Sequence, residues 1–572
     1  MDVRRGALWL GLIVLAAAGL RLLYLLQIRS IPFFDELVSD AARYDEWARA
    51  IASGDWLGST TFYQAPAYPY FLALVKVALG DSGLVIRLAQ IGLGALSCGL
   101  IGLAGWAFVS RRAGLWAAGL LACYAPALFF DGLVQKTALG QFLWCSCLAL
   151  MGWITVRPGL GKSLALGAVL GLFCLARENA LALIPVALIW VYLRPRRDGA
   201  RRGRGRRLGR SAALVAGLAL VLLPVAFRNL HVGGEFVLTT AQMGPNFYIG
   251  NNPEATGRYR PLIQGHETPQ FEQADASRLA EQALGRSLTP AEVSQFWMDR
   301  AWHYIRSQPA DWLALTARKW LFVWNAYEVP DTESYELYRH WSWLLAVLGA
   351  LGHFGLLVPV AAAGVVLAWP LRRRLLGLYV MVLVMALSVA VFYVFGRYRY
   401  PIVPVAMILA GAALERAVAL ARRRAWRALL VPAAVGGLAA VVVNWPIHPE
   451  GQLNALAWGN LGSALARQDN LDGAVICFER AVTGAPESAE MHYNLGLAFL
   501  VGGQTDRAVD EFQAALRLAP TLVEVDYQLA VALERLGRRD EAVAHYRLAI
   551  ERRPDDTDAQ AALKRLLPDP GR

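Results

Sequence analysis

The stretch ALWLGLIVLAAAGLRLLYLL at residues 7–26 decides the class of this chain. An α-helix needs roughly 20 apolar residues to cross the hydrocarbon core of a bilayer, and this stretch supplies them around a single charge, Arg21. It follows Arg4 and Arg5, as a signal peptide would, but it has no small-residue cleavage site and another apolar span comes after it. We therefore predict that it is retained as the first membrane helix.

The whole chain has the composition of a polytopic membrane protein. Of its 572 residues 56% are hydrophobic and 17% are charged, whereas soluble domains carry about 25% charged residues. Segment 163–193 is long enough for two short spans that meet near Arg177. The other predicted spans are 83–109, 113–130, 134–155, 212–228, 342–369, 375–395, 401–421 and 427–445. Together these segments predict about eleven transmembrane helices in an all-α fold.

The net charge of +12 reflects membrane orientation rather than a nucleic-acid partner. Arginines gather in short runs between apolar segments, which is the pattern of cytoplasmic loops. A cytoplasmic N-terminus places every run on that side and puts segments 29–81 and 229–340 on the outer face, with the C-terminal domain. In a bacterium this face of the inner membrane is periplasmic. Interpreting 163–193 as one span would reverse the orientation of everything after it.

A period of 34 residues begins near Ala457, where the hydropathy falls. Small residues recur at one position, large aromatic residues at another, and proline closes each unit. The recurring sets are Gly462, Gly496 and Ala530; Phe478, Phe512 and Tyr546; and Pro486, Pro520 and Pro554. This is the pattern of the tetratricopeptide repeat, a pair of helices that stacks into a solenoid. We predict a membrane domain at 1–450 and a three-repeat domain at 451–572, with the repeats at about 457–555.

The first outer segment carries the residues most suited to chemistry. Asp40 and Tyr44 are four residues apart, so they share one face of a predicted helix. Other short motifs follow in order along the chain. They are Arg43-Tyr44, SGDW at 53–56, PAYPY at 66–70, GNNPEATG at 250–257 and RYRYP at 397–401.

This set of motifs resembles the GT-C membrane glycosyltransferases of the family-39 kind. That group includes the protein O-mannosyltransferases and the aminoarabinose transferase that modifies lipid A. The resemblance covers roughly residues 1–445. This chain has Asp40-Ala41 where relatives often have Asp-Glu, and Ala65-Pro66-Ala67 where they have Lys-Pro-Pro. The absent lysine helps to hold the lipid phosphate in the aminoarabinose transferase, so the substrate does not carry over.

The resemblance implies that a sugar leaves a polyprenyl phosphate and passes to an acceptor hydroxyl with inversion. A carboxylate at the membrane surface can accept the hydroxyl proton, and Asp40 is the candidate by position. Asp131 ends the third predicted helix on the outer side, where relatives often have a polar or acidic group. Asp35 and Glu36 are alternative candidates.

The departing phosphate needs positive charge. Arg177 lies at a predicted outer hairpin tip, where the alternative is that it pairs with Glu178. Arg397 and Arg399 lie where a helix emerges, and they could instead extend to lipid headgroups. Arg43 and Tyr44 complete the candidate lipid-phosphate and substrate contacts.

No metal or nucleotide site is predicted. The histidines show no HxxxH or HExxH spacing, the six cysteines form no CxxC pair, and the glycine-rich stretches lack phosphate-loop spacing. No cofactor is therefore predicted, and the sequence leaves open whether a divalent cation assists.

Three functions remain for comparison. The first is a transferase that uses a polyprenyl-phosphate sugar as donor, with the repeats binding a protein acceptor or partner in the cell envelope. The second is a non-catalytic assembly scaffold, for which about eleven membrane helices are more than an anchor requires. The third is a lipid or solute transporter, which typically shows internal repeats and broken helices. The sequence favours the transferase.

Overall fold

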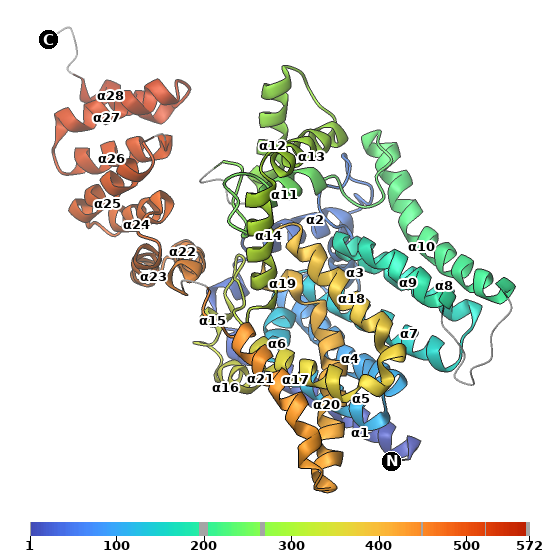
Figure 1. The fold of residues 1–572 in the computed structure, drawn as a ribbon. Coiled ribbons are helices and arrows are strands. Elements are labelled where there is room, and N and C mark those ends of the chain that lie inside the picture. The colour runs from blue at the N-terminus through green and yellow to red at the C-terminus, as the bar shows by residue number, and fades with distance from the viewer. Residues whose placement is uncertain (1, 194–203, 264–268, 448–449, 521, 568–572) are drawn as a thin grey trace. The chain divides into compact units, whose positions relative to one another are not determined.

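The computed structural model describes residues 2–193, 204–263, 269–447, 450–520 and 522–567. Every regular element in these ranges is a helix (Figure 1). The chain forms two compact units. The membrane unit comprises Met1–Arg29, Ser39–Val329 and Tyr338–Ile447, and the repeat unit comprises Ser30–Val38, Pro330–Leu337 and His448–Arg572.

Eight helical segments of the membrane unit are long and apolar enough to cross a bilayer. They are α1 (Val3–Ile28), α4 (Gly83–Phe108), α7 (Thr137–Val156), α10 (Arg204–Gly233), α16 with α17 (Trp343–Leu367), η3 with α18 (Trp369–Ala390), α20 (Ile402–Arg422) and η4 with α21 (Trp426–Val443). Most of them run side by side in one bundle (Figure 1). The chain is therefore a multi-pass membrane protein.

Segment 163–193 forms two short apolar helices, as the sequence predicts. Helix α8 (Leu160–Ala176) ends where Arg177 turns to an extended backbone, with φ −146° and ψ 109°. The chain then continues through the short helix η2 (Glu178–Ala182) into α9 (Leu183–Leu193).

The predicted span at 113–130 contains a sharp bend. Helices α5 (Arg111–Ala122) and α6 (Ala125–Gly132) meet there at a bend of 55°. Tyr124 is extended, and Pro126 in the first turn of α6 has no amide hydrogen to continue the hydrogen-bond ladder. The amide of Ala125 instead donates to the carbonyl of Gly352 at 2.9 Å.

The outer segments are also helical. Segment 29–81 contains η1 (Pro32–Phe34), α2 (Asp40–Ala52) and α3 (Ala67–Leu79). Segment 229–340 contains α11 (Met243–Gly250), α12 (Pro269–Leu284), α13 (Pro290–Ser307), α14 (Pro309–Trp324) and α15 (Tyr335–Tyr338). Thr289 and Glu292 form a capping box that fixes the start of α13. The short helix α19 (Gly396–Arg399) precedes α20.

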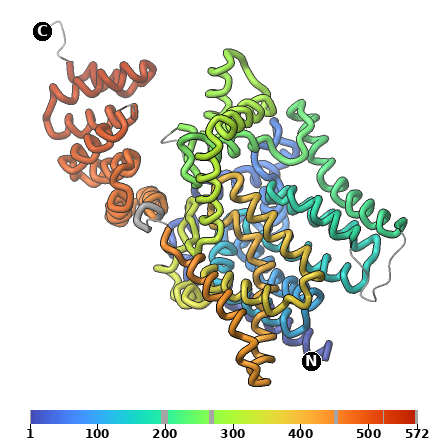
Figure 2. The backbone as a smooth tube through the Cα atoms, viewed as in Figure 1, coloured from blue at the N-terminus to red at the C-terminus, as the bar shows by residue number. Residues whose placement is uncertain are grey.

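The repeat unit consists of stacked antiparallel helix pairs, which Figure 2 shows in its orange and red part. The pairs are α22 (Glu450–Arg467) with α23 (Leu471–Gly484), α24 (Ala489–Val501) with α25 (Thr505–Leu518), and α26 (Val523–Arg535) with α27 (Arg539–Arg552), followed by α28 (Thr557–Leu566). The 34-residue pattern has the predicted packing role. A Cβ on Gly496 would lie 2.7 Å from the ring of Phe512, and one on Gly462 would lie 2.9 Å from Phe478.

Two segments from the first 340 residues pack within the repeat unit. Gln468 donates to the carbonyl of Pro32 at 3.3 Å, and Asn460 donates to the carbonyl of Thr332 at 2.9 Å. Ser334 donates to Asn454 of α22 at 2.9 Å. Segments 30–38 and 330–337 therefore form hydrogen bonds with side chains of the first repeat through their own backbone and side-chain groups.

Replacing Gly496 by leucine should lower the free energy of unfolding of the repeat unit by about 2 kcal/mol, because the new side chain must displace the Phe512 ring. The measurement is the rate of proteolysis of the repeats in the full-length protein. Asp510→Leu on the exposed side of α25 adds the same side chain without a packing conflict. Equal proteolysis of the two variants would contradict the packing argument.

Candidate functional site

Asp40 is the first residue of α2, and the backbone just before it is unusual. Ser39 has φ 53°, a conformation that residues other than glycine rarely adopt and that is often found near functional sites. A carboxylate in the first turn of a helix is stabilised by the helix dipole. The turn at Ser39 directs the buried Asp40 side chain into the membrane unit.

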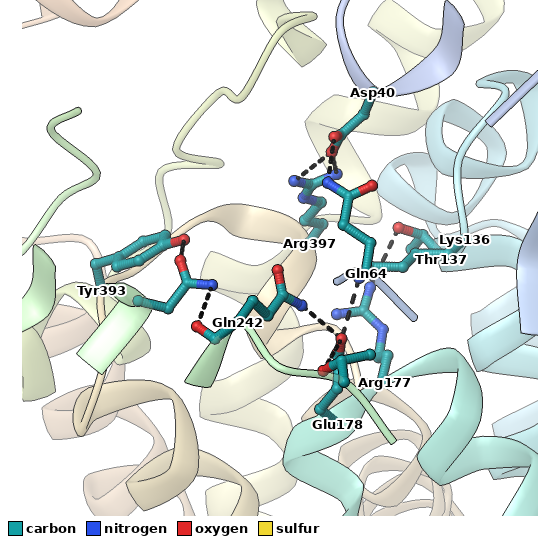
Figure 3. A network of polar contacts seen from close by, with 11 residues as sticks. Asp40, Gln64, Lys136, Thr137, Arg177, Glu178, Gln242, Tyr393 and Arg397 are labelled. Carbon is teal, nitrogen blue, oxygen red and sulfur yellow. Dashed lines mark hydrogen bonds and ion pairs between the residues drawn. The ribbon is translucent and has the colours of Figure 1, made fainter. Parts of the chain in front are cut away.

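Asp40 is held by residues from two distant parts of the chain. Both terminal nitrogens of Arg397, Nη1 and Nη2, lie 3.0 Å from its Oδ2. Nε2 of Gln64 donates to its Oδ1 at 3.3 Å. Figure 3 shows Arg397 and Gln64 converging on the carboxylate. The sequence prediction named Asp40 and Arg397 separately, and the structure brings them into direct contact.

The surrounding charges keep Asp40 ionised. Burial alone would raise the pKa of its carboxyl group, but Arg397 and Lys136 outweigh that effect, and the pKa lies below its ordinary value. Asp40 is therefore an anion at neutral pH that accepts hydrogen bonds on both oxygens.

A second carboxylate, Glu178, organises the other side of the cluster. It accepts a hydrogen bond from Gln242 at 2.6 Å and one from Thr240 at 3.4 Å, and it lies 3.8 Å from Nζ of Lys136. Its chain neighbour Arg177 instead donates to the hydroxyl of Thr137 at 3.2 Å. Arg177 is buried, and its guanidinium makes no shorter contact with Glu178, so the alternative of a simple Arg177–Glu178 pair does not describe this site.

Three cations and two carboxylates thus share one buried cluster. The cations are Lys136, Arg177 and Arg397, and each is less than a tenth exposed. Together with Asp40 and Glu178 they leave an excess of one positive charge. Such an excess away from bulk water favours an anionic ligand, because attraction between charges is stronger there than in water.

Lys136 and Glu178 were not predicted as site residues. Lys136 falls inside the stretch that the sequence analysis assigned to the span 134–155, and its charge there was the available signal. Glu178 was considered only as a partner of Arg177.

Glu272 of α12 is a further acid near Asp40 that the sequence analysis did not identify. Burial raises the pKa of its carboxyl group to about 7, and the negative charge of Asp40 adds to the increase. Arg43, Lys136 and Arg397 act in the opposite direction. Arg43 therefore lies within the electrostatic range of the site, beside Glu272.

Tyr44 and Arg399 have other surroundings. The ring of Tyr44 is buried edge-on against Tyr68, with 5.3 Å between ring centroids. Arg399 donates to the carbonyl of Tyr327 at 2.8 Å and forms an ion pair with Glu328 at 2.9 Å. It also donates to the carbonyl of Asn325, so its guanidinium caps the C-terminal end of α14.

The other candidate acids have different surroundings from Asp40. Nε of Arg21 lies 2.7 Å from Oδ2 of Asp131, and both side chains are buried. A Cβ on Gly94 would lie 2.1 Å from the same Asp131 oxygen, so the pair depends on a glycine for space. Asp35 is exposed, and Glu36 lies 3.9 Å from Arg467, both within the repeat unit.

Within the described ranges, no group of three or more histidine, cysteine, aspartate or glutamate side chains has the geometry to hold a metal ion.

Comparisons with known proteins identify the repeats directly. Two tetratricopeptide-repeat family models match residues 460–523 and 500–566. The Arabidopsis OM64 TPR domain is 24% identical, with 20% of this chain and 96% of that chain covered and a TM-score of 0.20. The crystal structure of MamA is 24% identical, with coverages of 25% and 81% and a TM-score of 0.18. No curated protein matches the sequence.

The chain is also similar to a larger solved protein. The archaeal oligosaccharyltransferase AglB from Archaeoglobus fulgidus, solved with an inhibitory peptide and a dolichol-phosphate, is 16% identical with a TM-score of 0.44. The match covers 83% of this chain and 59% of that chain, so this protein spans little more than half the length of that enzyme.

Replacing Asp131 by asparagine should destabilise the membrane unit by about 3 kcal/mol, because it leaves Arg21 as an uncompensated buried charge. Thermal unfolding of the detergent-solubilised protein measures the loss. The double variant Arg21→Met with Asp131→Leu removes both charges and should recover most of the stability. A stable but inactive Asp131→Asn protein would instead support the predicted catalytic role.

Proposed function

We propose that this protein is a GT-C glycosyltransferase that moves a sugar from a polyprenyl-phosphate donor to an acceptor hydroxyl or amine, with inversion. The observation that carries the proposal is the buried cluster in which Asp40 meets Arg397 beside Lys136 and Arg177. The reaction needs one carboxylate and one phosphate site next to each other, and this cluster supplies residues for both.

The cations form the phosphate site in this proposal. A polyprenyl phosphate carries one negative charge while esterified to the sugar and gains a second as it leaves. Lys136, Arg177 and Arg397 exceed the two neighbouring carboxylates by one charge, so they favour the leaving state most strongly. Arg43, which interacts electrostatically with Glu272, adds a further positive charge near this phosphate site. This arrangement supplies charge neutralisation from side chains, whether or not a divalent cation takes part.

Asp40 acts as the general base. The acceptor oxygen attacks the anomeric carbon, its proton passes to Asp40, and the bond from that carbon to the phosphate oxygen breaks. The electron pair leaves with the polyprenyl phosphate. Attack opposite the leaving group gives inversion. Arg397 and Gln64 fix the orientation of the carboxylate, and its lowered pKa keeps it unprotonated and ready to accept.

The arginine distribution supports a location in the bacterial inner membrane, with the N-terminus in the cytoplasm and the site and repeats facing the periplasm. Tetratricopeptide repeats commonly bind protein segments, so the repeat unit is proposed to recruit a protein acceptor or an envelope-assembly partner.

Replacing Asp40 by asparagine should lower the transfer rate by at least about a hundredfold, because the amide keeps the size of the carboxylate but accepts no proton. Membranes containing the full-length protein are supplied with radiolabelled polyprenyl-phosphate sugars, and label is counted in protein and lipid fractions. Glu46→Gln is the matched control, since Glu46 is an exposed acid on the same helix. Its activity should be unchanged.

The other outcomes separate the competing functions. Transfer that persists in Asp40→Asn would move the base to another acid. Glu272 is then a candidate, because it interacts electrostatically with Asp40. A wild-type protein that moves labelled lipid across a vesicle membrane without covalent transfer would be a transporter. A protein that does neither with any donor, but retains a partner through its repeats, would be a scaffold.

Donor affinity should weaken as the pH rises through about 7, because Glu272 then ionises and places another negative charge near the phosphate site. An added repulsion on the order of 1 kcal/mol corresponds to roughly a fivefold increase in Kd. Equilibrium binding of a polyprenyl-phosphate hexose between pH 6 and 8 measures the effect. Glu272→Gln should remove the pH dependence, whereas Glu254→Gln, an exposed control, should keep it. A pH-independent wild type would place Glu272 outside the donor site.

A further inference from the structure

The side-chain amide of Gln64 has two polar atoms, and only its nitrogen has a hydrogen-bond partner among the described residues. The residue lies in the connection between α2 and α3 and is 7% exposed. Its Nε2 donates to Asp40 at 3.3 Å. The opposite end of the same amide, Oε1, is buried and has no hydrogen-bond partner among the residues that the structure describes.

The orientation of this amide follows from chemistry. An ionised carboxylate only accepts hydrogen bonds, so the nitrogen of Gln64 must face Asp40 and the oxygen must face away from it. Figure 3 shows that arrangement, with the amide oxygen turned away from the Asp40 carboxylate. A buried acceptor without a donor costs about 1–3 kcal/mol, so such groups usually meet a ligand or an ordered water.

The surroundings indicate which ligand chemistry fits. The neighbouring charged groups, Lys136 and Arg397, act on the same Asp40 carboxylate and belong to the proposed phosphate site. A ligand group that reaches Oε1 must donate a hydrogen bond while its phosphate meets the cations. A sugar next to a phosphate has this combination, because its ring hydroxyls are donors a few bonds away from the phosphate oxygen.

We infer that Oε1 of Gln64 accepts a hydrogen bond from a substrate hydroxyl and is a determinant of sugar specificity. This inference rests on the proposed glycosyl transfer. The same amide then holds the sugar with its oxygen and the general base with its nitrogen, which fixes the distance between the anomeric carbon and Asp40. A site built around a hydrogen bond to a hydroxyl rejects analogues that lack it.

The hydroxyl could belong to the transferred sugar or to the acceptor, and the test has one arm for each. Wild-type protein and Gln64→Met, both full length in lipid nanodiscs, are assayed with polyprenyl-phosphate hexoses and their monodeoxy analogues. In the second arm the donor is constant and the acceptor hydroxyl compounds are varied. Gln295→Met, an exposed glutamine on α13, is the control.

For the wild type, loss of one particular donor hydroxyl should lower kcat/KM roughly three- to tenfold, the effect of one neutral hydrogen bond. Gln64→Met should show at least that loss with the parent sugar, because it also removes the hydrogen bond to Asp40. It should show no further loss with that deoxy analogue, while other deoxy positions behave as in the wild type. The same coupling in the acceptor arm alone would assign Oε1 to the acceptor hydroxyl.

Two results would overturn the inference. In the first, each deoxy analogue lowers kcat/KM by the same factor in Gln64→Met as in the wild type. Gln64 then contacts no substrate hydroxyl and only supports Asp40, while the transferase function stands. If the wild type transfers no sugar from any donor, the proposed function and this inference fall together. A thermal-unfolding temperature of Gln64→Met equal to that of the wild type separates both results from misfolding.

Discussion

The ion pair between Asp40 and Arg397 joins side chains that are 357 residues apart in the sequence. Taking two charges out of water is expensive, and the cost is recovered only when the geometry is good and the remaining polar atoms are satisfied. Here two guanidinium nitrogens share one carboxylate oxygen and Gln64 takes the other. The positions of α2, α19 and the segment before α3 relative to one another all depend on this contact.

A second buried pair in the same unit shows the contrast between structural and functional charge. Arg21 and Asp131 face each other at 2.7 Å between α1 and α6, with one guanidinium for one carboxylate. Around Asp40 the cations Lys136, Arg177 and Arg397 outnumber the two carboxylates. A balanced pair stabilises the packing of helices. A cluster with an excess of positive charge can still bind an anionic ligand.

The sequence predicts most of the fold because its signals are local. Apolar length gives the membrane helices, and the 34-residue period gives the repeats down to the contact of Gly496 with Phe512. The bend between α5 and α6 was missed, although Pro126 signals it, because the apolar run continues through it.

The site was less predictable because its contacts join distant parts of the chain. The family resemblance placed Asp40, Arg177 and Arg397 among the candidates, but nothing local shows that Asp131 has Arg21 as a partner. Glu178 is recognised as a site residue through its contact with Gln242, and Gln64 through its contact with Asp40. Both partners lie in other segments of the chain. Their functional roles stay predictions.

The inclusion of segments 30–38 and 330–337 in the repeat unit has a consequence for modularity. The chain passes between the two units at five points, next to residues 29, 38, 329, 337 and 447. A tail domain attached by one linker can be exchanged between proteins by a single recombination event. The repeat unit of this chain cannot be exchanged in that way. A foreign repeat array would lack the surface on which the buried rings of Phe33 and Phe34 pack, and the side chain that donates to the carbonyl of Thr332. The repeats and segments 30–38 and 330–337 must therefore change together in evolution.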